Sequence, residues 1–332
     1  MQLQPPYLLF LGDAQDDLTA KTGAGIAQWR PEWCVGQLRL PGCQTTLGLP
    51  DMTLEDAREA GARTLVVGVA NRGGIISEGW MQTFLDALDL GYDVAAGLHQ
   101  RLVDIPALRQ AADHRGRLLA DVRHPRDRFG VGTGEPRTGR RLLAVGTDCS
   151  VGKMYTTLAL EREMKARGMK ADFRATGQTG ILIAGTGVSV DAVVADFISG
   201  AVESLCPAND EDHWDLIEGQ GSLFHPSFAG VSLGLLHGAQ ADALVLCHEP
   251  DRLHMRGLPQ QPLPDLQDCM DLNLACARLT SPSPRFVGIA LNTRRLDDSA
   301  AERVLRETAD HFGLPTVDPV RTGVGPIVDA LA

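Results

Sequence analysis

The sequence predicts an α/β protein of two domains, an N-terminal Rossmann-like parallel sheet and a C-terminal P-loop NTPase-like parallel sheet. Three observations support this prediction. Short apolar runs alternate with helical patterns through both halves, which is the order found in parallel sheets covered by helices. A stretch rich in Arg, Gly and Pro over 123–141 separates the halves, and a glycine-rich loop soon after it joins an apparent strand to an apparent helix.

The first half alternates strand and helix patterns. "YLLFLGD" (7–13) and "RTLVVGVA" (63–70) are continuous hydrophobic runs, which are typical of strands whose two faces are both covered. "TLEDAREAGA" (53–62) and "EGWMQTFLDALDLG" (78–91) predict helices that end at a glycine. "YDVAAGLH" (92–99) predicts a further strand, so we expect β-α-β-α order and a sheet of Rossmann type.

The second half repeats the alternation more clearly. "RLLAVGT" (141–147) predicts a strand, and "GKMYTTLALEREMKARG" (152–168) predicts a helix with a glycine stop. The apolar run over 192–201 predicts another helix, capped by Asp191. Further strands are expected over 214–221, 241–250, 285–293 and 315–320, and a late helix over 299–313. These strands end in polar residues, and ligands of open α/β sheets bind at the carboxyl ends of strands.

The connecting stretch sets the predicted domain boundary. With 332 residues the chain can form two cores of ordinary size. We expect a Rossmann-like domain over 1–130 and a P-loop domain over 131–332. Neither half contains an internal repeat or a low-complexity tract.

Composition and charge exclude several classes of partner. The formal net charge is -11, with no block of like charges, and such a surface repels phosphate backbones and anionic lipids. No apolar run approaches the ~20 residues that span a bilayer, and the N-terminus lacks the basic region of a signal peptide. We expect neither nucleic acid nor membrane as a partner, and we expect a homo-oligomer that acts on a small molecule.

The seven cysteines are scattered without C-x-x-C spacing. An odd, unpatterned set favours reduced thiols over disulfides or a zinc site. The sequence therefore predicts a cytoplasmic protein without a bound metal.

The stretch "VGTDCSVGKMYTT" (145–157) almost completes the phosphate-binding pattern G-x-x-x-x-G-K-[ST]. Backbone N–H groups of such a loop and of the following helix form an anion site, and the lysine adds a mobile positive charge. The residues expected to bind a cofactor phosphate are Gly146, Thr147, Asp148, Cys149, Ser150, Val151, Gly152, Lys153 and Met154.

Met154 stands where the pattern requires a hydroxyl. In magnesium-dependent NTPases that hydroxyl binds the metal, and a thioether is a poor ligand for magnesium. Thr156 and Thr157 lie further along the helix and point in other directions. Coenzyme A fits such a loop, because its pyrophosphate must be neutralised but need not be cleaved. We therefore expect a thioester of coenzyme A as the ligand and no metal.

Three side chains are candidates for acid–base chemistry: Asp51, Glu218 and His225. Glu218 ends the strand pattern "WDLIEGQG", at the place where a nucleotide-hydrolysing relative carries a catalytic carboxylate. His225 follows closely, and a neutral imidazole could take a proton from an ammonium group. Structural roles remain open for all three.

Other polar residues near strand ends are candidates for binding the substrate or the coenzyme. Arginines can bind carboxylates in a fork, while Cys149 could carry an acyl group or merely fill space. Asn292 and Arg321 are placed to contact an adenine and its ribose. The substrate-binding candidates are Asn71, Arg72, Gly73, Arg174, Gln178 and Thr179.

Several motifs together resemble a known family. "GTDCSVGK" (146–153) is similar to the loop of dethiobiotin synthetase. With "TGQTG" (176–180), "VDAVVADFISGA" (190–201) and "EGQGSLFHP" (218–226), the chain more closely resembles the D-glutamate N-acetyltransferase family. The likeness covers nearly the whole chain, and its motifs after residue 145 are the specific ones.

This resemblance implies transfer of an acetyl group from acetyl-CoA to the amine of D-glutamate, within D-amino-acid catabolism. A P-loop that cradles a coenzyme has no need of a metal ligand, in agreement with Met154. Two alternatives stay open. One is a ligase or kinase that uses ATP and magnesium, as dethiobiotin synthetase does, and the other is a nucleotide-sensing module without catalysis.

Overall fold

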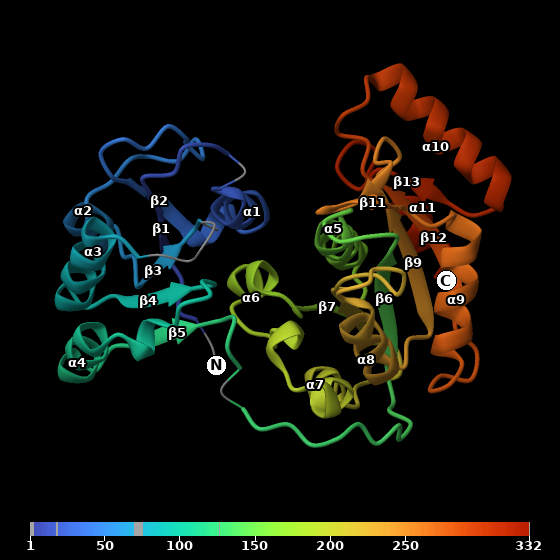
Figure 1. Cartoon of the computed structure of the whole chain (residues 1–332), viewed down its shortest axis with the longest axis horizontal. Coiled ribbons are helices and arrows are strands. Elements are labelled where there is room, and N and C mark those ends of the chain that lie inside the picture. The colour runs from blue at the N-terminus through green and yellow to red at the C-terminus, as the bar shows by residue number, and fades with distance from the viewer. Residues whose placement is uncertain (1–2, 18, 70–75, 126, 332) are drawn as a thin grey trace. The chain divides into compact units, whose positions relative to one another are not determined.

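The computed structural model describes residues 3–17, 19–69, 76–125 and 127–331 and divides into two compact units. The N-terminal unit comprises Met1–Asp127 together with Gly177–Ala192, and the C-terminal unit comprises Arg128–Thr176 with Val193–Ala332. Each unit is built around its own parallel sheet (Figure 1). Among the described residues, no helix is long and apolar enough to cross a membrane.

The sheet of the N-terminal unit has the strand order β2-β1-β3-β4-β5, and all its neighbours are parallel. This is the doubly wound order whose topological switch point lies between the first and third strands. Its strands are β1 (Tyr7–Gly12), β2 (Cys34–Arg39), β3 (Thr64–Val67), β4 (Asp93–Ala96) and β5 (Leu119–Asp121). The strands predicted over 7–13, 63–70 and 92–99 are confirmed.

Helices cover both faces of this sheet (Figure 1). The unit's helices are α1 (Lys21–Trp29), α2 (Leu54–Glu59), α3 (Glu78–Asp89), α4 (Pro106–Arg115) and α6 (Gln178–Ala184). Local capping explains where the two predicted helices begin. Thr53 accepts the N–H of Asp56 in a capping box before α2, and Ser77 accepts the N–H of Trp80 before α3. Phe10, Trp80 and Phe84 meet edge to face in the core.

Helix α6 reaches the N-terminal unit from far along the chain. It packs beside α1, where Thr179 Oγ1 lies 3.4 Å from Thr22 Oγ1 (Figure 1). The N–H of Leu3 donates to the carbonyl of Gly185 at the end of α6, at 3.0 Å. The chain therefore leaves the C-terminal unit after Thr176, completes the N-terminal unit, and returns at Val193.

The sheet of the C-terminal unit has the order β13-β12-β9-β6-β8-β7, again entirely parallel. The predicted strands of this half are confirmed. They are β6 (Arg140–Gly146), β8 (Trp214–Ile217), β9 (Ala243–His248), β12 (Arg285–Leu291) and β13 (Thr316–Val317), to which the structure adds β7 (Ala171–Arg174). A short antiparallel hairpin of β10 (His254–Met255) and β11 (Leu258–Pro262) follows β9.

The helices of the C-terminal unit include the two predicted ones, over 152–168 and 299–313. They are α5 (Lys153–Ala166), α7 (Ile198–Leu205), α8 (Ala229–Ala239), α9 (Leu266–Ala277), α10 (Asp298–Phe312) and α11 (Gly325–Asp329). Glycines let α7 and α8 approach closely. A Cβ built at Gly238 would lie 2.3 Å from the carbonyl oxygen of Ser199.

The helix predicted over 192–201 with Asp191 as its cap is wrong. The structure has two short 3-10 turns there, and α7 begins only at Ile198. Asp191 instead forms an ion pair with Arg123 at 2.8 Å and accepts a hydrogen bond from Ser189. These contacts hold Asp191 on the N-terminal unit, which ends at Ala192, whereas α7 belongs to the C-terminal unit. Asp191 is therefore not available to cap that helix.

The connecting stretch has no helix or strand over 128–138, yet it is held in place. The Glu203 carboxylate accepts the N–H groups of Thr133 and Gly134 at 2.9–3.0 Å. Arg137 donates to the carbonyls of Glu203 and Cys206 at 2.9 and 2.8 Å. Paired backbone groups of this kind turn an irregular segment into a fixed part of the C-terminal unit.

Candidate functional site: a phosphate loop in the C-terminal unit

Residues 146–153 form the loop between β6 and α5, at the carboxyl end of the sheet. Strand β6 lies between β8 and β9, so the segments that follow these neighbouring strands converge on the loop. Ser150 and Gly152 both have left-handed backbone angles, with φ of 56° and 110°. Such a backbone points successive N–H groups toward one side and forms an anion-binding nest. Among the described residues, no acceptor bonds to the N–H groups of Ser150, Val151 and Gly152.

Arg252 orients this loop from outside. Its guanidinium donates to the carbonyl of Cys149 at 2.7 Å and to the carbonyl of Ser150 at 3.2 Å. It also bonds the carboxylates of Asp148, at 2.8 Å, and Glu249. Because these carbonyls face Arg252, the loop's N–H groups remain available for an anion.

Asp148 is a bracing carboxylate of the loop. It is fully buried, and its Oδ1 accepts the N–H of Cys149 at 2.6 Å. Its Oδ2 accepts from Arg252 at 2.8 Å and from the backbone N–H of Arg256 at 2.7 Å. Both oxygens are therefore engaged in holding the loop.

Lys153 begins α5 and points back into the loop. Its Nζ donates to the carbonyls of Asp148 and Gly221, at 2.7 and 2.9 Å. The side chain is buried, and this burial lowers the pKa of the ammonium from its ordinary value. An anionic ligand would stabilise the charged ammonium of Lys153 and replace the two carbonyls as the partner of Nζ.

The hydroxyls of Thr156 and Thr157 do not replace the one lost at Met154. The Oγ1 of Thr156 donates to the carbonyl of Gly152 at 3.0 Å, and the Oγ1 of Thr157 donates to that of Lys153 at 2.8 Å. Both threonines are bonded to the helix backbone four residues before them, as hydroxyls within helices often are. The site therefore offers a phosphate cradle without the usual magnesium ligand.

Glu218 lies directly after β8, beside the loop. It is buried, and its Oε2 accepts the N–H of Thr176 at 3.0 Å. The next residue is tightly packed, since a Cβ built at Gly219 would lie 1.7 Å from the carbonyl oxygen of Ala144. Only glycine fits there, and this close approach holds the carboxylate against the end of the sheet.

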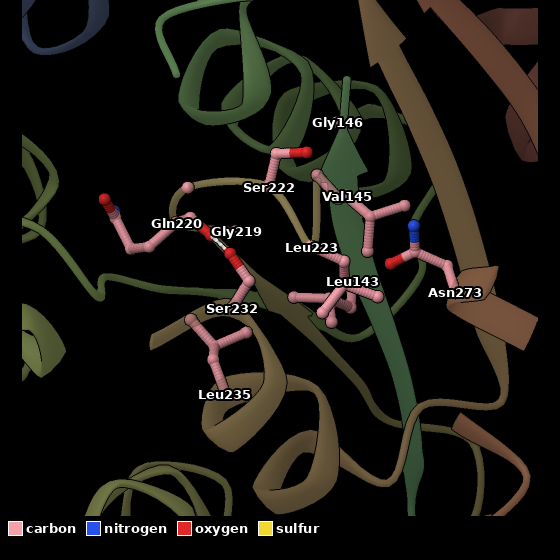
Figure 2. Close-up of a pocket in the computed structure, with 12 residues that line it drawn as sticks. Leu143, Val145, Gly146, Gly219, Gln220, Ser222, Leu223, Ser232, Leu235 and Asn273 are labelled. Carbon is pink, nitrogen blue, oxygen red and sulfur yellow. Dashed lines mark hydrogen bonds between the residues drawn. The ribbon is translucent and has the colours of Figure 1, made fainter. Parts of the chain in front are cut away.

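The segment after β8 is close-packed against the strand ends. Figure 2 shows Gly219, Gln220 and Ser222 on that segment, with Ser232 of α8 donating to the carbonyl of Gln220 at 2.7 Å. Asn273 of α9 closes the other side. The space enclosed is about 10 Å³, room for roughly one water. This cavity is thus too small for a coenzyme or an amino acid.

His248 ends β9 and contacts the start of the loop. Its Nδ1 lies 3.0 Å from Thr147 Oγ1, with which it shares a hydrogen bond. Burial, with the neighbouring Arg252, lowers the pKa of His248 to about 4. The ring is neutral at neutral pH and adds no charge to the phosphate site.

Cys149 is poorly suited to carry an acyl group. Burial raises the pKa of its thiol, although Lys153 and the nearby arginines oppose the shift. The thiolate is the nucleophilic form, and a raised pKa makes it scarce. The geometry favours a space-filling role.

Two of the predicted site residues form ion pairs inside their own units. Arg174 pairs with the buried Asp215 at 2.7 Å, so its guanidinium has a structural partner. Asp51 pairs with Arg39, whose hydrogen bonds, with one from Gln37, hold the pKa of Asp51 below its usual value. A carboxylate stabilised in this way is a weak base, and the structure favours a structural role for both residues.

Asn292 and Arg321 differ in their placement. A Cβ built at Gly152 would lie 3.9 Å from the Cβ of Asn292, which places Asn292 beside the loop. Arg321 instead bonds Asp298 and donates to the carbonyl of Leu296 at 2.6 Å. Of these two residues, Asn292 is the one that lies beside the loop.

The other substrate candidates belong to the N-terminal unit. Gln178 and Thr179 lie on α6, where they contact residues of that unit. Asn71, Arg72 and Gly73 lie outside the described residues. A surface hollow of about 430 Å³ lies between α1 and the segment 45–49. Among the described residues that line it, Asp17 is the charged one.

Both halves of the chain match one family. Residues 38–125 match the Rossmann-like domain, and residues 128–328 the P-loop domain, of the domain-of-unknown-function family DUF1611. The chain belongs to the DUF1611 family. The crystal structure of a DUF1611 family protein from Anabaena variabilis resembles it with a TM-score of 0.84 and 33% identity, over 98% of this chain and 99% of that one.

Two full-length relatives in the DUF1611 family carry the name D-glutamate N-acetyltransferase. The protein from Tritonibacter scottomollicae is 56% identical over 330 residues, and that from a Pseudoalteromonas species is 49% identical over 328 residues. Both alignments cover 99% of each chain. These matches confirm the resemblance drawn from the motifs, and they identify the chain as an enzyme of the N-acetyltransferase class.

The residues that orient the loop belong to no motif in the sequence. Arg252, Glu249 and Arg256 lie about a hundred positions after it, in the segment "HEPDRLHMR" that follows β9. The polar residues at the end of β9 could have indicated them, because neighbouring parallel strands end at the same edge of the sheet.

Proposed function

We propose that this protein transfers the acetyl group of acetyl-CoA to the amine of D-glutamate. The names of its two full-length relatives, at 56% and 49% identity, support the reaction and the acceptor. We further propose that the phosphate loop binds the pyrophosphate of the coenzyme.

The observation that carries the coenzyme assignment is a complete anion cradle without a metal ligand. The N–H groups of Ser150, Val151 and Gly152 bond no acceptor among the described residues, and Lys153 supplies the positive charge. Met154 lacks the hydroxyl, and the hydroxyls of Thr156 and Thr157 bond the helix backbone. A diphosphate that stays intact needs only the amides and the lysine.

Glu218 is a buried carboxylate beside the loop that could accept the proton. The ammonium of the acceptor must lose a proton before its nitrogen attacks the thioester carbon, after which the carbon–sulfur bond breaks and the coenzyme thiol leaves. Glu218, at the end of β8 beside the loop, is the candidate base. Asn292, beside the loop's Gly152, is the candidate contact to the coenzyme.

The deciding experiment is calorimetric titration of the purified protein with acetyl-CoA, in EDTA and in magnesium, and separately with ATP plus magnesium. We expect acetyl-CoA to bind equally in EDTA and magnesium. Lys153→Ala removes a charge-assisted contact worth roughly 1.5–3 kcal/mol, so its affinity should fall about ten- to hundred-fold. Lys165→Ala, on the last turn of the same helix, is the matched control and should bind normally.

An assay of acetyl transfer to D-glutamate and to L-glutamate completes the test. Free coenzyme thiol should appear with D-glutamate. Tight ATP binding that requires magnesium, with no binding of acetyl-CoA, would overturn the proposal in favour of a ligase or kinase.

A further inference from the structure

His225 is a buried residue whose ring is held in one position. Only 2% of its surface is exposed, and its ring packs on Phe228 with 4.5 Å between ring centres. Its backbone is fixed as well. The N–H of His225 donates to Ser222, and its carbonyl accepts the N–H groups of Phe228 and Ala229. A ring held this firmly presents each of its nitrogens to a defined neighbour.

The hydrogen bond at Nδ1 determines which ring nitrogen carries the hydrogen. The backbone N–H of Ser227 donates to Nδ1 at 3.1 Å. A ring nitrogen that accepts a hydrogen bond carries no hydrogen, so the neutral imidazole carries its proton on Nε2. The ring therefore presents an N–H donor on its other side.

That donor faces the phosphate loop and has no acceptor among the described residues. The nearest carboxylate oxygen is Oδ1 of Asp148, at 3.9 Å, which is beyond hydrogen-bond length. Asp148 is already engaged, because its two oxygens accept from Cys149, Arg252 and Arg256. A buried N–H without a partner is costly, and such groups in folded proteins call for an explanation.

This geometry disfavours two other roles for His225. A general base at Nε2 would need a free lone pair there, but that nitrogen holds the hydrogen. A metal at the cluster of Asp148, Cys149 and His225, whose ligand atoms lie within 4.8 Å of one another, would also need that lone pair. Moving the hydrogen to Nδ1 would set it against the N–H of Ser227.

We propose that the Nε2–H of His225 donates to a phosphate oxygen of the diphosphate held by the loop. The ring would then act in binding, as a neutral donor beside the charged Lys153. This inference deepens the proposed function and rests on it, since the expected ligand is the pyrophosphate of the coenzyme.

The test compares two substitutions by calorimetry with inorganic pyrophosphate and with acetyl-CoA. His225→Phe keeps the packing on Phe228 and removes both nitrogens, so affinity for each ligand should fall about ten- to hundred-fold. His225→Gln places an amide N–H near the position of Nε2 and should recover most of that loss. His114→Phe, at an exposed position on α4, is the control and should bind as the wild type does.

Nitrogen-15 NMR of the histidine-labelled wild type is a second measurement that needs no variant. We expect the His225 signals of a ring protonated at Nε2, and a downfield shift of that proton when pyrophosphate is added. Full binding by His225→Phe, or a ring protonated at Nδ1, would overturn the inference while leaving the proposed function intact. Failure of the wild type to bind either ligand would overturn both.

Discussion

At the scale of single residues, Glu218 and His225 both follow β8 but offer different chemical groups to the loop. Glu218 is buried beside the loop and accepts one backbone N–H, and a carboxylate can take a proton. His225 presents a donor to the loop. We therefore propose proton transfer for the carboxylate and anion binding for the ring.

Glu218→Gln tests the base. Glutamine keeps an oxygen for the N–H of Thr176 but cannot accept the substrate's proton. We expect kcat to fall about 10²- to 10⁴-fold with the KM for acetyl-CoA within a few-fold. Glu203→Gln, which changes a carboxylate that binds the connecting segment, should leave kcat unchanged. An unchanged kcat in Glu218→Gln would make that carboxylate structural.

His248 should make folding stability depend on pH. Its pKa is about 4 in the folded protein and 6.5 unperturbed, so between these values the unfolded chain binds more protons. Stability is therefore lost as pH falls from about 6.5 to 4, by up to roughly 1.4 kcal/mol per pH unit.

Urea unfolding at pH 7 and pH 5 checks this dependence. His248→Gln should reduce the loss of stability between the two pH values, and His114→Gln, at an exposed site, should reproduce the wild-type loss. Equal losses in wild type and His248→Gln would show that the ring titrates normally in the folded state.

At the scale of elements, the loop between β6 and α5 depends on a residue far along the chain. Arg252 bonds two loop carbonyls and the fully buried carboxylate of Asp148. Removal of one partner of a buried ion pair leaves an uncompensated charge.

Arg252→Met should therefore destabilise the protein by about 3 kcal/mol and weaken acetyl-CoA binding. Adding Asp148→Asn removes the stranded charge and should restore part of the stability. The control is Arg256→Met, whose exposed side chain bonds the hydroxyl of Ser150, and its cost should stay below about 1 kcal/mol. Thermal unfolding measures all three, and an unaffected Arg252→Met would show that the loop holds its shape alone.

The sequence was informative where a feature is contiguous. The strands and α5 follow from apolar runs, and the loop with Lys153 lies within eight residues. Short elements such as β5, of three residues, carry too little pattern. Contacts made by Arg252 with the loop and by Arg174 with Asp215 join positions that only folding brings together. The local pattern assigned Asp191 to a helix cap, but in the folded protein it pairs with Arg123 instead.

At the scale of the whole molecule, α6 makes the N-terminal unit discontinuous. The helix and its flanks, Gly177–Ala192, belong to a unit whose other residues end at Asp127. Ile181, Leu182 and Ile183 of α6 are buried. Burying such side chains is worth roughly 1.5–3 kcal/mol each, which is a large share of a domain's net stability.

A fragment of residues 1–127 should therefore fail to unfold cooperatively, whereas the same fragment joined through a flexible linker to residues 177–192 should do so. Circular dichroism during heating distinguishes the two. A cooperative transition at the same temperature in both fragments would show that α6 is dispensable for this unit.

The late arrival of α6 also bears on synthesis. A ribosome finishes the five strands of the N-terminal sheet, then makes residues 128–176 before the last helix of that unit is translated. At roughly 5–20 residues per second this interval lasts several seconds. During it, the face beside α1 that α6 will cover stays exposed on the nascent chain. A nascent chain that ends before residue 177 therefore lacks the buried side chains of Ile181, Leu182 and Ile183.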